Sequence, residues 1–149
     1  MEREVAFAMK QFFAAQKHLD ELGVLHSEHY LEDVGRYLCQ LAYGLEPGPD
    51  ADRGVLDGRI GPSRVVIRIT NSPRRQPMEL REPLEFDELI VILGPNSGLR
   101  PPGVASDFIF YRFTPDEIRQ RFDARRERLI SRPDTFDRRF DRGMNMTSG

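Results

Sequence analysis

The arrangement of polar and apolar residues between positions 54 and 70 decides the fold class of this chain. The stretch reads GVLDGRIGPSRVVIRIT. In residues 64–70, apolar side chains recur at every second position, which is the period of a strand that buries one face. The turn-forming residues Gly-Pro-Ser at 61–63 separate this segment from residues 54–60, so the two segments predict a β-hairpin.

The sequence before the hairpin predicts two helices. Apolar residues recur every three or four positions over residues 5–22, and Gly23 ends this run. A second helix is expected to begin with Ser27 as its N-cap and to continue to Leu45. The stripe of the first helix that is expected to face the core consists of Val5, Ala8, Met9, Phe12, Ala15, Leu19 and Leu22.

The sequence after the hairpin predicts a loop, two strands and a helix. Residues 71–85 lack periodicity and form the expected loop, whereas the continuous apolar run at 89–93 is typical of a strand buried on both faces. A fourth strand is expected at 107–113, and Thr114 caps a helix that is expected to reach Leu129. We therefore expect an α+β fold of order α-α-β-β-β-β-α, with helices flanking a central mixed four-stranded sheet.

Length and composition indicate one domain. A chain of 149 residues with 39% hydrophobic residues can bury a core without disulfides, and Cys39 is its one cysteine. We expect a single domain over residues 1–142, made of an N-terminal helix at 1–26 and a core at 27–130, followed by a flexible tail at 143–149. The absence of a long apolar run and the charged N-terminus predict a cytoplasmic protein with no membrane segment.

The charge balance and the metal-binding residues exclude several classes of function. With 22 basic and 24 acidic residues, the chain lacks the basic field of a tight non-specific nucleic-acid binder. One cysteine and three histidines (His18, His26 and His29) do not make a structural zinc site. The sequence also has no Gly-rich phosphate loop before a helix. We therefore expect no resident cofactor.

Three residues on different predicted elements are candidates for a functional site. They are Glu32 on the second helix, Asp57 on the first strand and Arg68 on the second strand. The two strands of a hairpin lie about 5 Å apart, so these side chains can converge. A metal-dependent nuclease requires two or three carboxylates around a hard cation and a lysine that orients water. The alternative is that each of the three lies separately on the surface.

Several short motifs occur in an order that is known from a family of nucleases. The motifs are Tyr30-Leu31-Glu32, Tyr43-Gly44-Leu45-Glu46, Gly54-Val55-Leu56-Asp57, Arg64-Val65-Val66-Ile67-Arg68, Phe86-Asp87-Glu88-Leu89 and Tyr111-Arg112-Phe113-Thr114-Pro115. In this order they resemble the restriction-endonuclease-like superfamily, with the PD-(D/E)xK fold, and within it a group of small uncharacterised bacterial domains. The similarity covers about residues 27–120, and Phe86-Asp87 is its best single match.

The resemblance implies that Glu32, Asp57 and Arg68 occupy the catalytic positions, but the motif is degenerate. Val66 stands where the family has Gln or Glu and cannot bind a metal. Arg68 stands where the family has lysine, and a guanidinium does not give up its proton at neutral pH. Asp57 also falls one residue later than the family spacing. These departures predict a non-catalytic member that serves as a binding module.

We therefore weigh three functions. The first is a binding module for a partner protein or for nucleic acid, and the arginines expected to contact nucleic acid are Arg64, Arg68, Arg74 and Arg75. The second is a magnesium-dependent nuclease with Glu32, Asp57 and a displaced acid, for which the candidates are Glu79, Glu82 and Glu85. The third is a structural module that forms a homodimer through Phe7 and Phe13.

Overall fold

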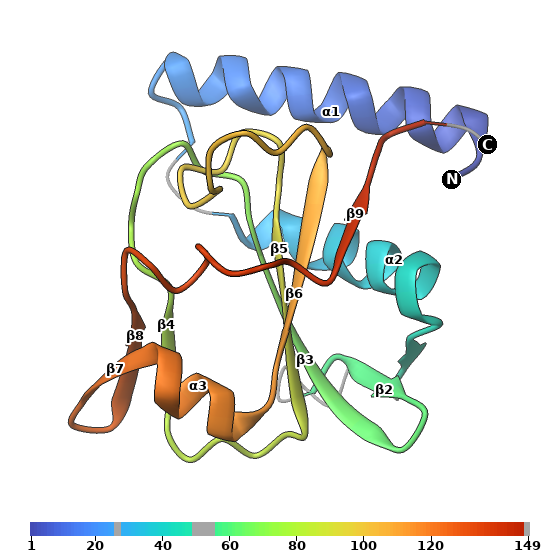
Figure 1. Ribbon diagram of the computed structural model, residues 1–149. Helices are drawn as coiled ribbons and strands as arrows, with labels where there is room; N and C mark the ends of the chain where they lie inside the picture. The colour runs from blue at the N-terminus through green and yellow to red at the C-terminus, as the bar shows by residue number, and fades with distance from the viewer. Residues whose placement is uncertain (26–27, 49–55, 148–149) are drawn as a thin grey trace.

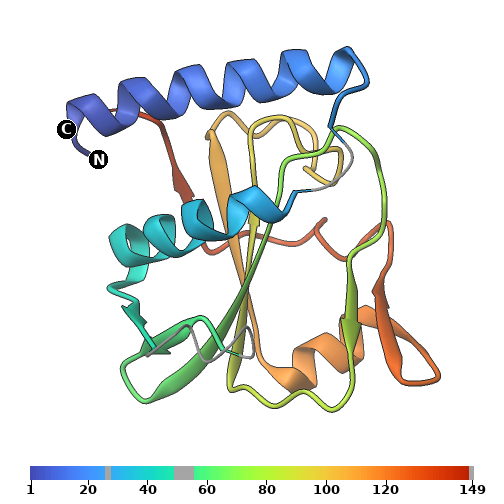
Figure 2. The same ribbon diagram turned by 180° about the vertical axis from the view of Figure 1, so that it is seen from behind.

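The computed structural model describes residues 1–25, 28–48 and 56–147, and shows an α+β protein in three layers (Figure 1, Figure 2). Two helices pack on one face of a six-stranded mixed sheet, and a second sheet of three strands packs with a short helix on the other face. The helices are α1 (Arg3–Glu21), α2 (Glu32–Tyr43), which follows the 3-10 turn η1 (His29–Leu31), and α3 (Pro115–Arg121).

The large sheet contains the predicted hairpin and both later strands. In spatial order its strands are β1 (Glu46–Pro47), β2 (Gly58–Ile60), β3 (Ser63–Thr70), β5 (Glu88–Leu93), β6 (Phe108–Phe113) and β9 (Arg142–Met144). Only β3 and β5 run parallel, and the other neighbours are antiparallel. The small sheet has the order β4 (Glu79–Arg81), β8 (Arg128–Ser131) and β7 (Phe122–Arg125).

Strand β5 is the centre of the core, as its continuous apolar sequence predicts. Every residue of β5 is buried. Ile90 packs toward α2 in one hydrophobic cluster, and Val91 packs toward the small sheet in the other. The prediction of a strand buried on both faces is therefore confirmed.

Helix α2 packs tightly on β3 at a glycine where the two elements meet. A Cβ atom on Gly35 would lie 3.2 Å from the Cγ2 atoms of both Ile67 and Ile69. The helix ends at Gly44, whose φ of 68° is the left-handed conformation expected of a C-terminal glycine. Helix α2 therefore covers one face of β3.

The buried face of α1 differs from the expected stripe. Its buried residues are Ala6, Met9, Phe13 and Gln16, so that only Met9 is shared with the stripe. The reason is an aromatic contact, because the ring of Phe13 meets the ring of Phe108 edge-on at 5.3 Å. This contact rotates α1 about its axis so that Phe13 faces the sheet. Phe13, at 2% exposed, belongs to the core and cannot serve a dimer, whereas Leu19 and Leu22 are exposed.

Two regions contain strands that the sequence pattern does not predict. The third helix ends at Arg121 rather than at 129, because residues 122–131 form the β7–β8 hairpin with a turn at Arg126, where φ is 60°. The expected loop at 71–85 contains β4, which pairs with β8 and buries Leu80. Strands β4 and β8 are short and pair with each other, and a local sequence pattern does not reveal a pairing between distant segments.

The central sheet has six strands rather than four because both of its edges are extended by short strands. The two residues of β1 pair with β2, and β9 pairs with β6. Strand β9 starts where the flexible tail was expected, and Met146 beyond it is buried and donates its N–H to Asp107 Oδ2 at 2.7 Å. The expected cap at Ser27 and the start of the hairpin at 54–55 lie outside the described residues. In the described part of the chain, no helix has the length and apolar character of a membrane span.

Candidate functional site

A cleft of about 520 Å³ runs along β3 and brings the predicted site residues together. Its walls are the second half of β3, the start of α2 and the segment that leads into β4. Glu32, Asp57 and Arg68 all line this cleft, as does Glu79. The structure thus places these four side chains around one hollow, and their contacts decide what the hollow can do.

Both oxygens of the Asp57 carboxylate are engaged within the protein. Oδ1 accepts a hydrogen bond from Arg36 Nε at 3.0 Å, and Oδ2 accepts one from the backbone N–H of Ile67 at 2.7 Å. The Asp57 side chain is only 17% exposed and that of Arg36 only 21%. Asp57 therefore ties the start of the hairpin to both β3 and α2.

Arg68 has a structural partner, whereas Glu32 is largely free in the described part of the chain. Arg68 Nη2 donates to the backbone oxygen of Glu79 at 3.0 Å and so connects β3 to β4. Glu32 is 61% exposed, and the imidazole of His29 lies 3.6 Å from its carboxylate. Val66 packs with the cluster on the small-sheet side, on the other face of β3 from α2.

The described residues hold no preformed group of three or more magnesium ligands. Proteins bind magnesium through one or two carboxylates together with water and substrate oxygens. Among the described residues, no group of three or more His, Cys, Asp or Glu side chains is placed to hold a metal. The displaced acids do not supply the missing ligands, because Glu79 pairs with Arg128 at 3.0 Å and Glu82 with Arg119 at 3.4 Å. Glu85 lines a separate hollow beside Val66.

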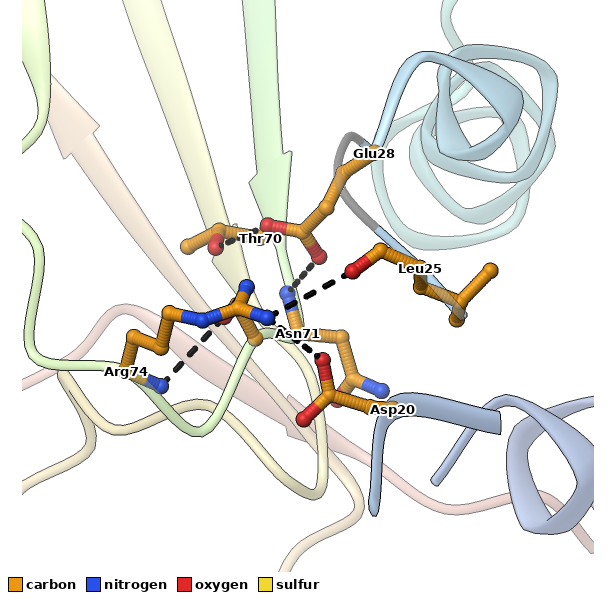
Figure 3. Close-up of polar contacts among 7 residues, drawn as sticks. Asp20, Leu25, Glu28, Thr70, Asn71 and Arg74 are labelled. Atoms are coloured by element: carbon orange, nitrogen blue, oxygen red, sulfur yellow. Dashed lines mark hydrogen bonds and ion pairs between the residues drawn. The ribbon is translucent and has the colours of Figure 1, made fainter. Parts of the chain in front are cut away.

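Two of the four arginines expected to contact nucleic acid are paired with carboxylates. Arg64 binds Asp87 through its backbone N–H and its guanidinium, which raises the pKa of Arg64 and lowers the pKa of Asp87. Arg74 Nη2 lies 3.1 Å from Asp20 Oδ1 and 3.4 Å from the backbone oxygen of Leu25 (Figure 3). Arg68 and Arg74 line the cleft.

The remaining arginine of this group, Arg75, is exposed. The charges around the cleft are mixed. It is lined by four carboxylates, by three guanidinium groups and by His29. A phosphate would have to displace carboxylates from most of these guanidinium groups.

The least expected feature of the cleft is the open edge of β3. Strand β2 pairs only with residues 63–65, although β3 continues to Thr70. Peptide groups alternate in direction along a strand, and Val65 accepts from Asp57 N on the β2 side, so the peptide groups of Ile67 and Ile69 point to that side as well. On its other side β3 is paired with β5 over its whole second half.

Two carboxylates close the ends of this open edge. Asp57 binds the N–H of Ile67, and Glu28 Oε2 accepts from the N–H of Asn71 at 2.6 Å (Figure 3). Glu28 Oε1 also accepts from the Thr70 hydroxyl at 2.7 Å. Between the two carboxylates, the peptide of Ile69 has no hydrogen-bond partner within the part of the chain that the structure describes. We refer to the segment from Ile67 to Asn71 as the open edge.

Glu28 and Arg36 are site residues that sequence reasoning missed. The contact of Glu28 with Thr70 joins residues 42 positions apart, and no local pattern marks it. One signal in the sequence indicates that β3 needs partners other than β2. The apolar alternation extends over residues 64–70 on one arm of the hairpin but is interrupted by Asp57 and Gly58 on the other arm.

Comparisons with known proteins do not assign the chain to a family. No protein-family model matches it, and no curated protein is significantly similar to it in sequence. The resemblance to restriction-endonuclease-like proteins therefore rests on the short motifs described above.

The contacts of Asp57 predict that its role is structural. In Asp57→Ala the half-buried Arg36 and the N–H of Ile67 lose their acceptor, so the free energy of unfolding should fall by about 1–3 kcal/mol. The matched control is Asp33→Ala, which removes the other carboxylate on Arg36; its side chain is 97% exposed, so the expected loss is about 0.5 kcal/mol at most. Urea denaturation measures both values. Equal losses, or a stabilised Asp57→Ala variant, would contradict a structural role.

Proposed function

We propose that this protein is a non-catalytic binding module that takes up an extended segment of a partner protein along the open edge of β3. The observation that carries the proposal is that the peptide of Ile69 has no hydrogen-bond partner among residues 1–25, 28–48 and 56–147, and that carboxylates bind the N–H groups on either side of it. An exposed strand edge is a template for an added strand, whose backbone supplies the hydrogen bonds. The protein would then be a binding module, and the degenerate nuclease-like motif would account for the presence of Asp57 and Arg68 in the cleft.

The charges of the cleft favour a protein segment over nucleic acid. Its carboxylates outnumber its arginines, and Arg36, Arg68 and Arg74 already bind protein oxygens. Glu32 is the most available charge, because it is 61% exposed and its only close partner in the described part of the chain is His29. We therefore expect the bound segment to carry lysine or arginine near the start of α2.

A peptide selection tests this function. Nine-residue peptides displayed on phage are selected against the whole protein, and the best sequence is synthesised with and without N-methyl groups at alternate residues. The unmodified peptide should bind with a Kd of about 1–100 μM, and N-methylation should weaken it at least about tenfold because it removes backbone donors. Glu32→Gln should weaken a basic peptide about threefold, whereas Glu4→Gln, on the exposed first turn of α1, should have no effect.

Two kinds of result would contradict this function. Equal binding by the N-methylated peptide, or no selected peptide with a Kd below about 1 mM, would reject strand addition. Cleavage of DNA or RNA that requires magnesium or manganese and is lost in Glu32→Ala would favour the nuclease instead.

A second function, formation of a homodimer, is favoured by the outer face of α1. The exposed stripe of this helix is apolar, and its members repeat in steps of four and three residues: Ala8, Phe12, Ala15, Leu19 and Leu22. Such a repeat matches the seam between two amphipathic helices. Phe7 is 64% exposed beside this stripe, whereas Phe13 is in the core. We therefore propose that a second copy of the chain covers the stripe.

Sedimentation equilibrium over a range of concentrations tests the homodimer. The unmodified protein should dimerise, and Leu19→Glu combined with Leu22→Glu should leave a folded monomer, because charges at a helix seam oppose association. Leu41→Glu is the matched control, since Leu41 is similarly exposed at 43% but lies on α2. A monomeric unmodified protein, or a dimer that persists in the double variant, would exclude this interface.

A further inference from the structure

The pairing of the strands in the small sheet places three arginines side by side. Arg81 of β4 lies opposite Arg128 of β8, and Arg128 lies opposite Arg125 of β7. Residues that are opposite each other on paired strands project from the same face of a sheet. Their neighbours Leu80 and Leu129 are buried in the core, so the three arginines project from the outer face, where all of them are exposed. We refer to Arg81, Arg128 and Arg125 as the arginine row.

The arginine row carries more positive charge than the fold neutralises. Arg128 Nη1 lies 3.0 Å from Glu79 Oε1. Arg81 and Arg125 have no carboxylate within ion-pair distance among residues 1–25, 28–48 and 56–147. Like charges that are directly opposite each other on neighbouring strands destabilise a sheet. The free protein therefore bears a cost in this row that a bound anion would remove.

The turn between β7 and β8 adds a further guanidinium group beside the row. Arg126 has a φ of 60°, which is the left-handed conformation that favours glycine. The turn is fixed in place, because the backbone oxygen of Glu127 accepts a hydrogen bond from the N–H of Glu82 at 2.8 Å. Side chains held in this conformation are concentrated at functional sites. Arg126 thus occupies a position that folding alone would give to glycine.

The surroundings of the arginine row favour a compact anion. The next row on the same face consists of Glu79, Ile130 and Asp123, and Glu127 follows Arg126 in the turn. A nucleic-acid backbone that extends beyond the row would lie against these carboxylates, and contacts between like charges oppose binding. The arginine row spans two strand spacings, which is about 10 Å. A single phosphate group fits this width without reaching the carboxylates.

A hollow of about 510 Å³ adjoins one end of the row. Arg81 lines this hollow together with Val66, Leu84 and Phe86, and these three apolar side chains are only partly buried. A peptide that places a phosphate on the row can place a neighbouring apolar side chain in the hollow. A free phosphate or a sugar phosphate has no such group, so the hollow favours a phosphate that is carried on a protein.

We propose that the arginine row binds a phosphorylated serine or threonine of a partner protein. Guanidinium groups bind phosphate oxygens through paired hydrogen bonds, and clusters of arginines recognise phosphorylated peptides. Neighbouring strands lie about 5 Å apart, so a phosphate above Arg128 is within reach of both Arg81 and Arg125. Among the described residues that line the cleft, none belongs to the arginine row, so this site is separate from the open edge of β3.

A peptide array probed with the whole protein tests the site. Its nine-residue peptides have a central phosphoserine and random flanking residues, and the best sequence is synthesised with phosphoserine and with serine. The phosphorylated peptide should bind with a Kd of about 10–500 μM, and the serine peptide at least about tenfold more weakly. Free O-phosphoserine, which cannot reach the hollow, and a twelve-nucleotide DNA duplex should each bind at least about tenfold more weakly as well.

Variants of the small sheet separate binding from stability. Arg81→Gln combined with Arg125→Gln should weaken phosphopeptide binding at least about tenfold. Because this double change removes like-charge repulsion, the thermal midpoint of the free protein should stay the same or rise by about 1–3 °C. Arg126→Gly should weaken binding about threefold without lowering the thermal midpoint, because glycine suits the left-handed turn. The matched control is Arg3→Gln, at an exposed arginine of α1, which should leave binding unchanged.

Several results would overturn the proposal. They are the absence of any phosphopeptide with a Kd below about 1 mM, equal binding of the serine peptide, of O-phosphoserine or of the DNA duplex, and undiminished phosphopeptide binding by the double variant. Equal losses of binding in the double variant and in Arg3→Gln would also overturn it, because the effect would then reflect overall charge rather than the row.

Discussion

The unequal lengths of β2 and β3 are the constraint on which the rest of this structure depends. Strand β2 has three residues and β3 has eight, so the second half of β3 lies beside β5 on one side and beside no strand that the structure describes on the other. Backbone groups at such an edge need partners from elsewhere. Asp57 and Glu28 supply two of them, and the cleft is the space between these two carboxylates.

The same constraint explains why Asp57 and Arg68 lie along β3 without forming, among the described residues, a group of ligands for a metal. Asp57 lies beside β3 because its carboxylate replaces a missing strand partner, and Arg36 then neutralises this partly buried charge. Arg68, on the same strand, reaches across to the backbone of Glu79 and joins the two sheets. Asp57 and Arg68 are thus held by contacts within the fold, which is compatible with the binding function that we propose for the cleft.

Those parts of the fold that depend on local chemistry could be predicted, and those that depend on distant partners could not. The apolar run of β5, the glycine stop of α2 and the N-cap at Thr114 are each local and were correctly interpreted. The rotation of α1 depends on the contact of Phe13 with Phe108, and β4 and β8 depend on each other. The candidate site follows this division: sequence reasoning proposed Glu32, Asp57 and Arg68 but missed Glu28 and Arg36, because the positions of these two are set by contacts between distant segments.

Native-state hydrogen exchange of the backbone amides in β3 tests the central claim most directly. The N–H of Ile69 faces the cleft, whereas that of Arg68 faces β5, so the amide of Ile69 should exchange about 100-fold faster or more in the free protein. The N–H of Ile67, which is bound by Asp57, should be protected. Addition of a bound peptide should slow the exchange of Ile69 toward that of Arg68. Equal protection of Ile69 and Arg68 in the free protein would contradict the account, because the edge would then already be closed.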